Sequence, residues 1–177
     1  MDVLVFDTGP LSHFARADIL GVLKVVVGER RAIVPEAVLT ELREGLHVDS
    51  RVQAVLDADW IEHRTIETTA EAKAYAKFGR RLVSGDRNVG DAAVLALAQT
   101  VPARAVIDDW DACDIARKER VIFSRTLNLL CEAVHSKLLT IDFVSEIADE
   151  LIRTEYRLPF GPGEFKTWTA RQNLFLE

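Results

Sequence analysis

Residues 3–10 have the sequence Val3-Leu4-Val5-Phe6-Asp7-Thr8-Gly9-Pro10, and the rest of the chain is best understood from them. Four apolar residues run directly into an aspartate, and an apolar run this short is typical of a strand buried on both faces. Pro10 suits the first turn of a following helix. We therefore expect Asp7 at the carboxyl end of a central parallel strand, where open α/β sheets bind ligands. A second interpretation is that Asp7 or Thr8 only caps that helix.

The composition predicts a folded chain with a large core. The 177 residues are 49% hydrophobic and 28% charged, and a chain of this length buries roughly 70% of its unfolded surface. We expect one domain over residues 1–139 and a helical, aromatic extension over 140–177 packed on it. The net charge of −6 argues against a broad basic surface for duplex DNA but leaves room for a local basic groove.

The two cysteines, Cys113 and Cys131, have neither the number for a disulfide framework nor the spacing of a zinc site. We see no basic segment followed by an apolar core, as a signal peptide requires, and no apolar run long enough for a membrane span. We therefore expect a cytoplasmic protein without a membrane partner.

Short apolar runs and helical spacing alternate along the chain. Further strands are predicted at 32–34, 60–63, 105–107 and 121–123, the last at the edge of the sheet. Helices are predicted at 12–27, 36–44, 49–58, 68–78, from Asp91 onward, after residues 108–111 to about Arg117, 127–138 and 141–152, with a polar, glycine-rich loop at 79–90. This alternation predicts a three-layer α/β/α sandwich around a mostly parallel sheet of four to five short strands.

Several carboxylates are predicted to meet at one edge of this sheet. Asp7 and the Asp108–Asp109 pair each follow an apolar strand, and parallel strands end on the same side. Glu41 lies in the second turn of a helix that follows another strand, and its side chain leans back toward that helix's start. Asp91 begins a helix after Gly90. Taken singly, each acid has a plainer interpretation as a solvated residue or a helix-capping residue.

Taken together, the acids indicate a metal site. Two like charges about 4 Å apart repel by about 4 kcal/mol at an effective dielectric constant of about 20. Several carboxylates at one edge must therefore carry protons or be neutralised by a cation. Since no histidine or cysteine cluster accompanies them, the ligands are hard oxygens, which suit Mg²⁺ or Mn²⁺ better than zinc. Such an ion with open water positions supports phosphoryl chemistry.

The ordered set of motifs over residues 1–136 resembles the PIN-domain nucleases, whose best-known members are the VapC-type toxins. The motifs are Asp7 after the first strand, Glu41 in a helix opened by Pro35, Gly90-Asp91 before an alanine-rich helix, and Ile107-Asp108-Asp109-Trp110-Asp111. The resemblance implies a ribonuclease in which Asp7, Glu41, Asp91 and Asp109 are catalytic. It also implies that Asp7, Asp91 and one or more of Asp108, Asp109 and Asp111 ligate Mg²⁺ or Mn²⁺.

The chain departs from the family pattern in two places. Many members have Thr or Ser two residues before the last key Asp, and here Ile107 precedes both Asp108 and Asp109, so the choice between them stays open. The aromatic tail after Leu139 is longer than in typical VapC-type toxins. The alternatives are a non-catalytic PIN-type RNA-binding or scaffold module and a protein whose acidic edge holds a structural cation. A haloacid-dehalogenase-type phosphatase is disfavoured because Gly9 replaces its second Asp.

Basic and aromatic residues near the acids are candidates for RNA contact. Arg80, Arg81 and Arg87 lie in the predicted loop before Asp91, where they could hold phosphates, or could simply be solvated. Trp110 could stack on a base, or could belong to the core or an interface. The resemblance also implies a homodimer and, if the protein is a toxin, a small antitoxin partner that blocks the acidic edge.

Overall fold

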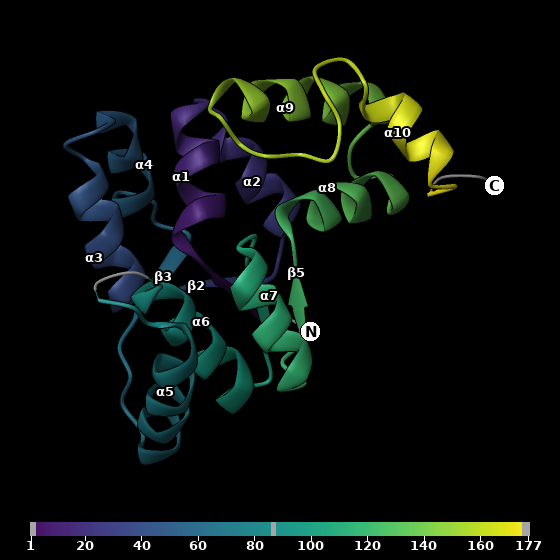
Figure 1. Cartoon of the computed structure of the whole chain (residues 1–177). Coiled ribbons are helices and arrows are strands. Elements are labelled where there is room, and N and C mark those ends of the chain that lie inside the picture. The colour runs from purple at the N-terminus through teal and green to yellow at the C-terminus, as the bar shows by residue number, and fades with distance from the viewer. Residues whose placement is uncertain (1–2, 86–87, 175–177) are drawn as a thin grey trace.

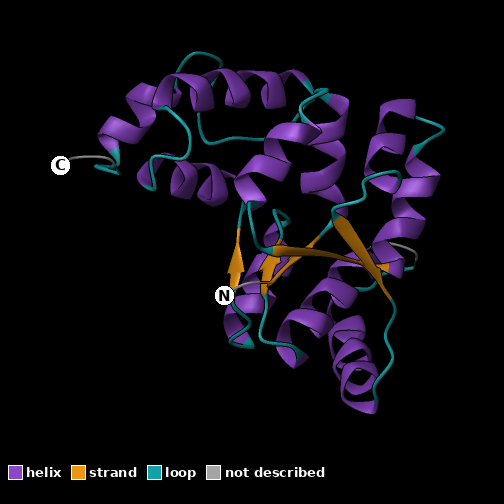
Figure 2. Cartoon of the chain, turned by 180° about the vertical axis from the view of Figure 1, so that it is seen from behind, coloured by secondary structure: helices purple, strands orange, loops and turns teal. Residues whose placement is uncertain are grey.

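The computed structural model describes residues 3–85 and 88–174, and its centre is a five-stranded sheet (Figure 2). The strands are β1 (Val3–Phe6), β2 (Arg31–Pro35), β3 (Ile61–Arg64), β4 (Arg104–Val106) and β5 (Phe123–Ser124). Their order is β3-β2-β1-β4-β5, and all four pairings are parallel. The predicted α/β fold with β1 at the centre and the 121–123 region at the edge is therefore confirmed, with shifts of one or two residues at strand ends.

Helices cover both faces of this sheet (Figure 1). They are α1 (Thr8–Arg16), α2 (Leu20–Val27), α3 (Glu36–Gly45), the 3-10 helix η1 (Ser50–Val52), α4 (Gln53–Leu56), α5 (Thr69–Leu82), α6 (Val89–Thr100), α7 (Trp110–Lys118), α8 (Thr126–His135), α9 (Ile141–Arg153) and α10 (Phe165–Arg171). In Figure 2 the strands separate α5, α6 and α7 from α1, α2, α8 and α9. This is the predicted three-layer sandwich.

Small side chains let α6 lie directly against the sheet. Every residue from Gly90 to Ala98 is buried, and the helix contacts β1, β2 and β4. The facing strand residues Leu4, Val5 and Phe6 are fully buried, as a strand covered on both faces requires. The acid in the first turn of α6, Asp91, is thereby fixed close to the end of β1.

The predicted helix over 12–27 is in fact two helices. Asp18 has a φ of 59°, and the Ile19 N–H donates to the Phe14 carbonyl while the Asp18 N–H donates to the Ala15 carbonyl. This is a Schellman ending with aspartate in the position that glycine usually takes. The sequence has no glycine at this position, which would have indicated the end of the helix.

The predicted boundaries of two other helices were wrong. The predicted loop over 79–90 is shorter, because α5 continues to Leu82 and takes Arg80 and Arg81 into its last turn. The predicted helix over 49–58 is divided into η1 and α4, and Asp49 caps η1 by accepting from the Arg51 N–H.

The C-terminal residues add a helical layer above α8 (Figure 1). One side of α9 is buried through Val144, Ile147, Ala148 and Leu151, and α10 packs on α9. Phe160 closes this contact, with its ring centroid 5.1 Å from that of Trp168. A division at residue 139 stays a prediction. None of the helices in the described ranges has the length and apolar character needed to cross a membrane.

Candidate active site

Asp7 lies at the point where the strand order changes direction. The chain runs from β1 toward β2 on one side and returns to β4 on the other, and such a switch point is where parallel sheets form ligand sites. The Asp7 N–H donates a 3.1 Å hydrogen bond to the Val106 carbonyl, which extends the β1–β4 pairing by one residue. Its carboxylate also accepts from the Gly9 N–H at 3.5 Å. Asp7 therefore has two roles: it caps α1, and it lies at the edge of the sheet.

Glu41 reaches this edge from the second turn of α3. Its Oε2 accepts a hydrogen bond from the Thr8 hydroxyl, and its Oε1 accepts one from the Gly90 N–H at 2.8 Å. A Cβ on Gly90 would lie 2.7 Å from Glu41 Oε2, so only glycine leaves room for the carboxylate. Three elements far apart in sequence thus hold one side chain in place. Gly90 was predicted only as part of the Gly90-Asp91 motif, and the sequence gave no sign that its N–H and the Thr8 hydroxyl would hold Glu41.

Of the acids in this group, Asp91 has the surroundings that least favour a charged carboxylate. It is buried, and its Oδ1 has no hydrogen-bond partner among the described residues. Burial raises the pKa of Asp91 to about 9. The neighbouring charges that add to this shift come from Asp7, Asp109 and Glu41. An unpaired carboxylate oxygen at such a site costs free energy unless a proton or a cation compensates it.

Asp7 has the same kind of environment. Burial raises the pKa of Asp7 to about 7, and the charges of Glu41 and Asp108 add to this rise. Hydrogen bonds from the Thr8 and Gly9 backbone act in the opposite direction and lower the pKa. The structure therefore places Glu41, Asp108 and Asp109 close enough for their charges to act on Asp7 or Asp91. We call these five residues the acidic cluster.

Asp108 and Asp109 face different partners. Asp108 is held at the start of α8, where the Thr126 N–H donates to Oδ1 at 3.0 Å and the Thr126 hydroxyl to Oδ2 at 2.7 Å. Burial raises the pKa of Tyr156, and the nearby charge of Asp108 adds to this shift. Asp109 is exposed and caps α7 by accepting from the Ala112 N–H at 2.9 Å. Asp111 is exposed in the first turn of α7, and its charge does not contribute to either raised pKa.

The expected RNA-contacting residues are spread over two regions. Arg81 forms an ion pair with Glu119 at the end of α7, whereas Arg80 is exposed in the last turn of α5. Arg87 lies outside the described residues. Trp110 is 71% exposed beside the acidic cluster, and the Arg125 guanidinium lies over its ring at 5.6 Å. Trp110 is thus neither a core nor an intrachain interface residue.

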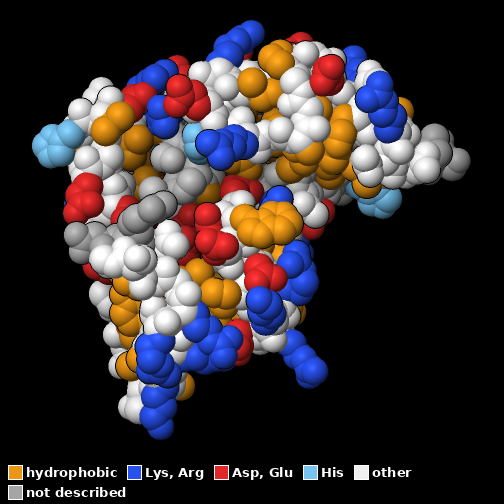
Figure 3. Space-filling view, viewed as in Figure 1, with side chains coloured by type: hydrophobic (Ala, Val, Ile, Leu, Met, Phe, Trp, Pro, Cys, Tyr) orange, Lys and Arg blue, Asp and Glu red, His pale blue; other side chains and the backbone are white. Residues whose placement is uncertain are grey.

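Hollows flank the acidic cluster on two sides. Thr8 and Glu41 line one of about 220 Å³, together with Arg16. Asp108 and Arg125 line a larger one of about 760 Å³ beneath the C-terminal residues. Figure 3 shows acidic side chains gathered between the upper helices and the α6–α7 layer, with basic side chains around them.

The donor chemistry of the acidic cluster fits a hard divalent cation. Its donors are carboxylate oxygens, one of them buried without a partner, and Mg²⁺ and Mn²⁺ prefer such ligands. As the side chains stand, residues 3–85 and 88–174 contain no ready-made group of three His, Cys, Asp or Glu residues that could hold a metal ion. Ion binding would therefore have to draw the carboxylates closer together.

Comparison with known families decides the classification. A family model described as a PIN domain matches residues 3–161. The chain belongs to the PIN-domain family. The family match and the observed fold bear out the resemblance seen in the sequence, and the match extends through α9 to Gly161. A search of curated proteins gave no match. Membership associates this PIN domain with nuclease chemistry.

Proposed function

We propose that this PIN domain is an Mg²⁺- or Mn²⁺-dependent endoribonuclease that hydrolyses RNA phosphodiester bonds. The observation that carries the proposal is the buried, unpaired Oδ1 of Asp91 within a cluster of acids contributed by the β1–α1 junction, α3, α6 and the β4–α7 connection. A purely structural role would leave this oxygen paired, because an unpaired buried acceptor destabilises the fold.

Asp7, Glu41, Asp91 and Asp109 are the proposed catalytic residues, and Asp7, Asp91, Asp108 and Asp109 the proposed metal-holding ones. Asp111 stays a weaker candidate, because it is exposed at the edge of the site. A bound divalent ion would supply charge neutralisation and a more acidic water. Glu41, oriented by Thr8 and Gly90, would accept a proton from the attacking water at a carboxylate oxygen.

The acidic cluster would repel RNA by itself, so phosphate contacts must come from cations around it. Arg125 lies beside Asp108 and Trp110, and Arg16 lines the smaller hollow with Glu41. Arg80 and Arg81 remain candidates on α5, although the ion pair with Glu119 occupies Arg81. Phosphate contacts of this kind position the strand without reading its sequence.

Cleavage of labelled single-stranded RNA tests the proposal. Purified wild-type protein is incubated with Mg²⁺, with Mn²⁺ or with EDTA, next to Asp91→Asn and the exposed control Asp59→Asn. We expect cleavage only with a divalent ion, by the wild type and Asp59→Asn but not by Asp91→Asn. RNA binding without cleavage would favour the non-catalytic RNA-binding or scaffold module. Cleavage that persists in Asp91→Asn would assign the activity to another site or a contaminant.

We further propose that the protein is the toxin of a type II toxin–antitoxin pair and forms a homodimer. The support is the resemblance of its motifs to VapC-type toxins. Induced expression in a bacterial host should arrest growth with the wild type and not with Asp91→Asn. Light scattering of the purified chain measures the dimer, and co-expression with the product of a neighbouring short reading frame tests the antitoxin. Unchanged growth would remove the toxin assignment while leaving the ribonuclease proposal intact.

A further inference from the structure

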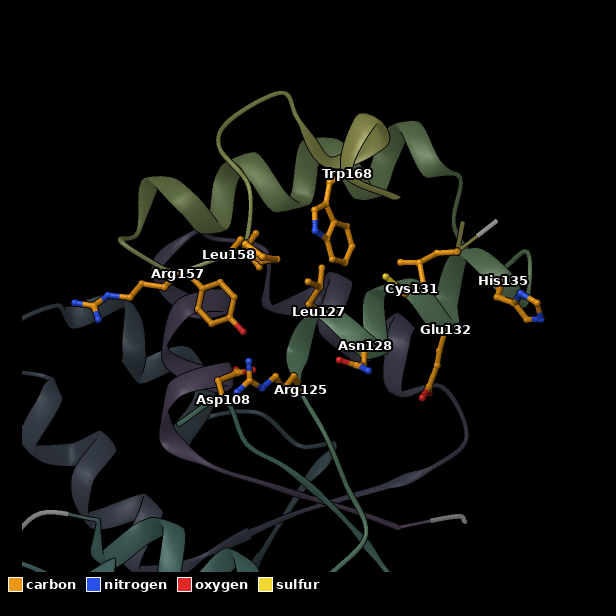
Figure 4. Close-up of a pocket in the computed structure, with 13 residues that line it drawn as sticks. Asp108, Arg125, Leu127, Asn128, Cys131, Glu132, His135, Arg157, Leu158 and Trp168 are labelled. Carbon is orange, nitrogen blue, oxygen red and sulfur yellow. The ribbon is translucent and has the colours of Figure 1, made fainter. Parts of the chain in front are cut away.

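The larger hollow beside the acidic cluster has the size and the walls of a ligand pocket. Its volume of about 760 Å³ lies within the range of about 300–1,000 Å³ typical of small-molecule sites. Figure 4 shows Trp168 and Leu158 on one side, and Leu127 and Cys131 on the other. We call it the α8 pocket, because residues of α8 form its floor.

The α8 pocket is continuous with the acidic cluster. Asp108 lines the pocket at one end, and the charge of the same carboxylate raises the pKa of Asp7. Arg125 lines the pocket as well, and its guanidinium lies over the exposed Trp110 ring. A strand whose phosphate lay at the acidic cluster would therefore have its neighbouring nucleotide at the mouth of the pocket.

The walls of the α8 pocket suit a flat aromatic group. Trp168 and Tyr156 contribute aromatic rings, and Leu127, Leu158 and Pro159 contribute apolar surface. Phe160 and Phe165 brace the Trp168 ring, with centroids 5.1 Å and 6.3 Å away. A braced aromatic ring is a stacking platform that loses little conformational entropy on binding.

The charges around the α8 pocket suit a phosphate attached to that group. Its carboxylates already have partners: Glu132 accepts from Arg104 at 2.6 Å, and Asp108 accepts from Thr126. Arg125 and Arg157 also line the pocket, and neither forms an ion pair with another residue of the described ranges. A base in the pocket would thus have two guanidinium groups near its backbone.

We propose that the α8 pocket receives one nucleobase of the RNA, next to the scissile phosphate, and gives the enzyme a base preference there. The proposal rests on the ribonuclease function proposed above. Stacking holds the base, and Asn128, an exposed amide on the pocket wall, is available to its hydrogen-bonding edge. The C-terminal residues would then be part of the substrate site.

Binding of a short labelled RNA in EDTA tests this without cleavage. Fluorescence anisotropy compares the intact strand with strands that carry one abasic nucleotide at successive positions. We expect one position at which loss of the base weakens binding by about 10-fold, the effect of losing a stacking contact. Asn128→Trp, which fills the pocket from its exposed wall, should remove that position dependence. The control Glu146→Trp, on the exposed face of α9, should keep it.

The outcomes separate this inference from the proposed function. Equal binding of every abasic strand, or position dependence that survives in Asn128→Trp, overturns the nucleobase site. In that case the α8 pocket is left to another occupant such as a protein segment. Cleavage of random-sequence RNA with Mn²⁺ is measured in parallel. Cleavage without a base preference at the cut contradicts only the nucleobase site. Position-dependent binding without cleavage contradicts only the proposed ribonuclease activity.

Discussion

The Gly90 N–H donates a 2.8 Å hydrogen bond to Glu41 Oε1, although 49 residues separate the two in sequence. The contact requires glycine, because a Cβ at residue 90 would lie 2.7 Å from Oε2 of the same carboxylate. The start of α6 and the second turn of α3 are thereby joined at the acidic cluster. Two groups that orient Glu41, the Gly90 N–H and the Thr8 hydroxyl, come from outside its own helix.

We expect Gly90→Ala to lower RNA cleavage while preserving the fold. The new methyl group displaces only the flexible end of Glu41, and alanine in a helix is more stable than glycine by roughly 0.5–1 kcal/mol. Misplacing a positioned proton acceptor costs up to about 10²–10⁴-fold in rate. Gly79→Ala in α5, where the methyl group meets nothing within 4 Å, is the matched control. Wild-type cleavage by Gly90→Ala would show that the position of Glu41 is unimportant.

We expect Asp91→Asn to raise the metal-free melting temperature. The substitution removes a carboxyl that must take up a proton to stay buried beside Asp7, Asp109 and Glu41, and it keeps the size of the side chain. Each 1 kcal/mol gained should raise Tm by about 2–4 °C in a domain of this size. Added Mn²⁺ should stabilise the wild type but not the variant, since only the wild type offers the full ligand set. A large loss of stability without metal would make Asp91 a structural residue.

Stability at acidic pH should depend on His13. Its ring lies 2.8 Å from the Thr154 hydroxyl and packs against Tyr156, which fastens the end of α9 to α1. Burial lowers the pKa of His13 below 6.5, and Arg16 adds to this while Asp108 and Glu155 oppose it. The unfolded chain therefore binds a proton more readily, and this contribution to folding is lost as the pH falls below about 6.5.

Chemical unfolding on both sides of pH 6.5 measures this effect. The loss of unfolding free energy on acidification should be smaller in His13→Gln than in the wild type. His63→Gln, at an exposed position of β3, should behave as the wild type does. The comparison between variants is needed because Asp7 and Asp91, with raised pKa values, gain stability over the same change. Identical losses in the wild type and His13→Gln would contradict the role of His13.

RNA affinity should depend more on Arg125 than on Arg81. Arg125→Ala removes a cation beside the acidic cluster, whereas Arg81 is already paired with Glu119. We expect Arg125→Ala to weaken binding in EDTA and to lower the slope of log affinity against log salt by about one. The control is Arg31→Ala, because Arg31 begins β2 and so lies at the end of the strand away from the acidic cluster. A larger effect of Arg81→Ala would move the RNA path toward α5.

The order of elements and the sheet edge were predictable because they follow from local patterns. The apolar run before Asp7 and the one before Asp108 each mark a buried strand, and parallel strands place both acids at one edge. The break at Asp18 was missed because aspartate rarely occupies the left-handed region. By contrast, the proximity of Tyr156 to Asp108 had no sequence signal, because it depends on α9 folding back over α1.

Calorimetric titration of the metal-free protein with Mn²⁺ tests most directly whether the acidic cluster is a metal centre. We predict at least one site per chain in the wild type, release of protons on binding near neutral pH, and loss of that site in Asp91→Asn but not in Asp59→Asn. Equal Mn²⁺ binding by Asp91→Asn, or none by the wild type, would contradict the account.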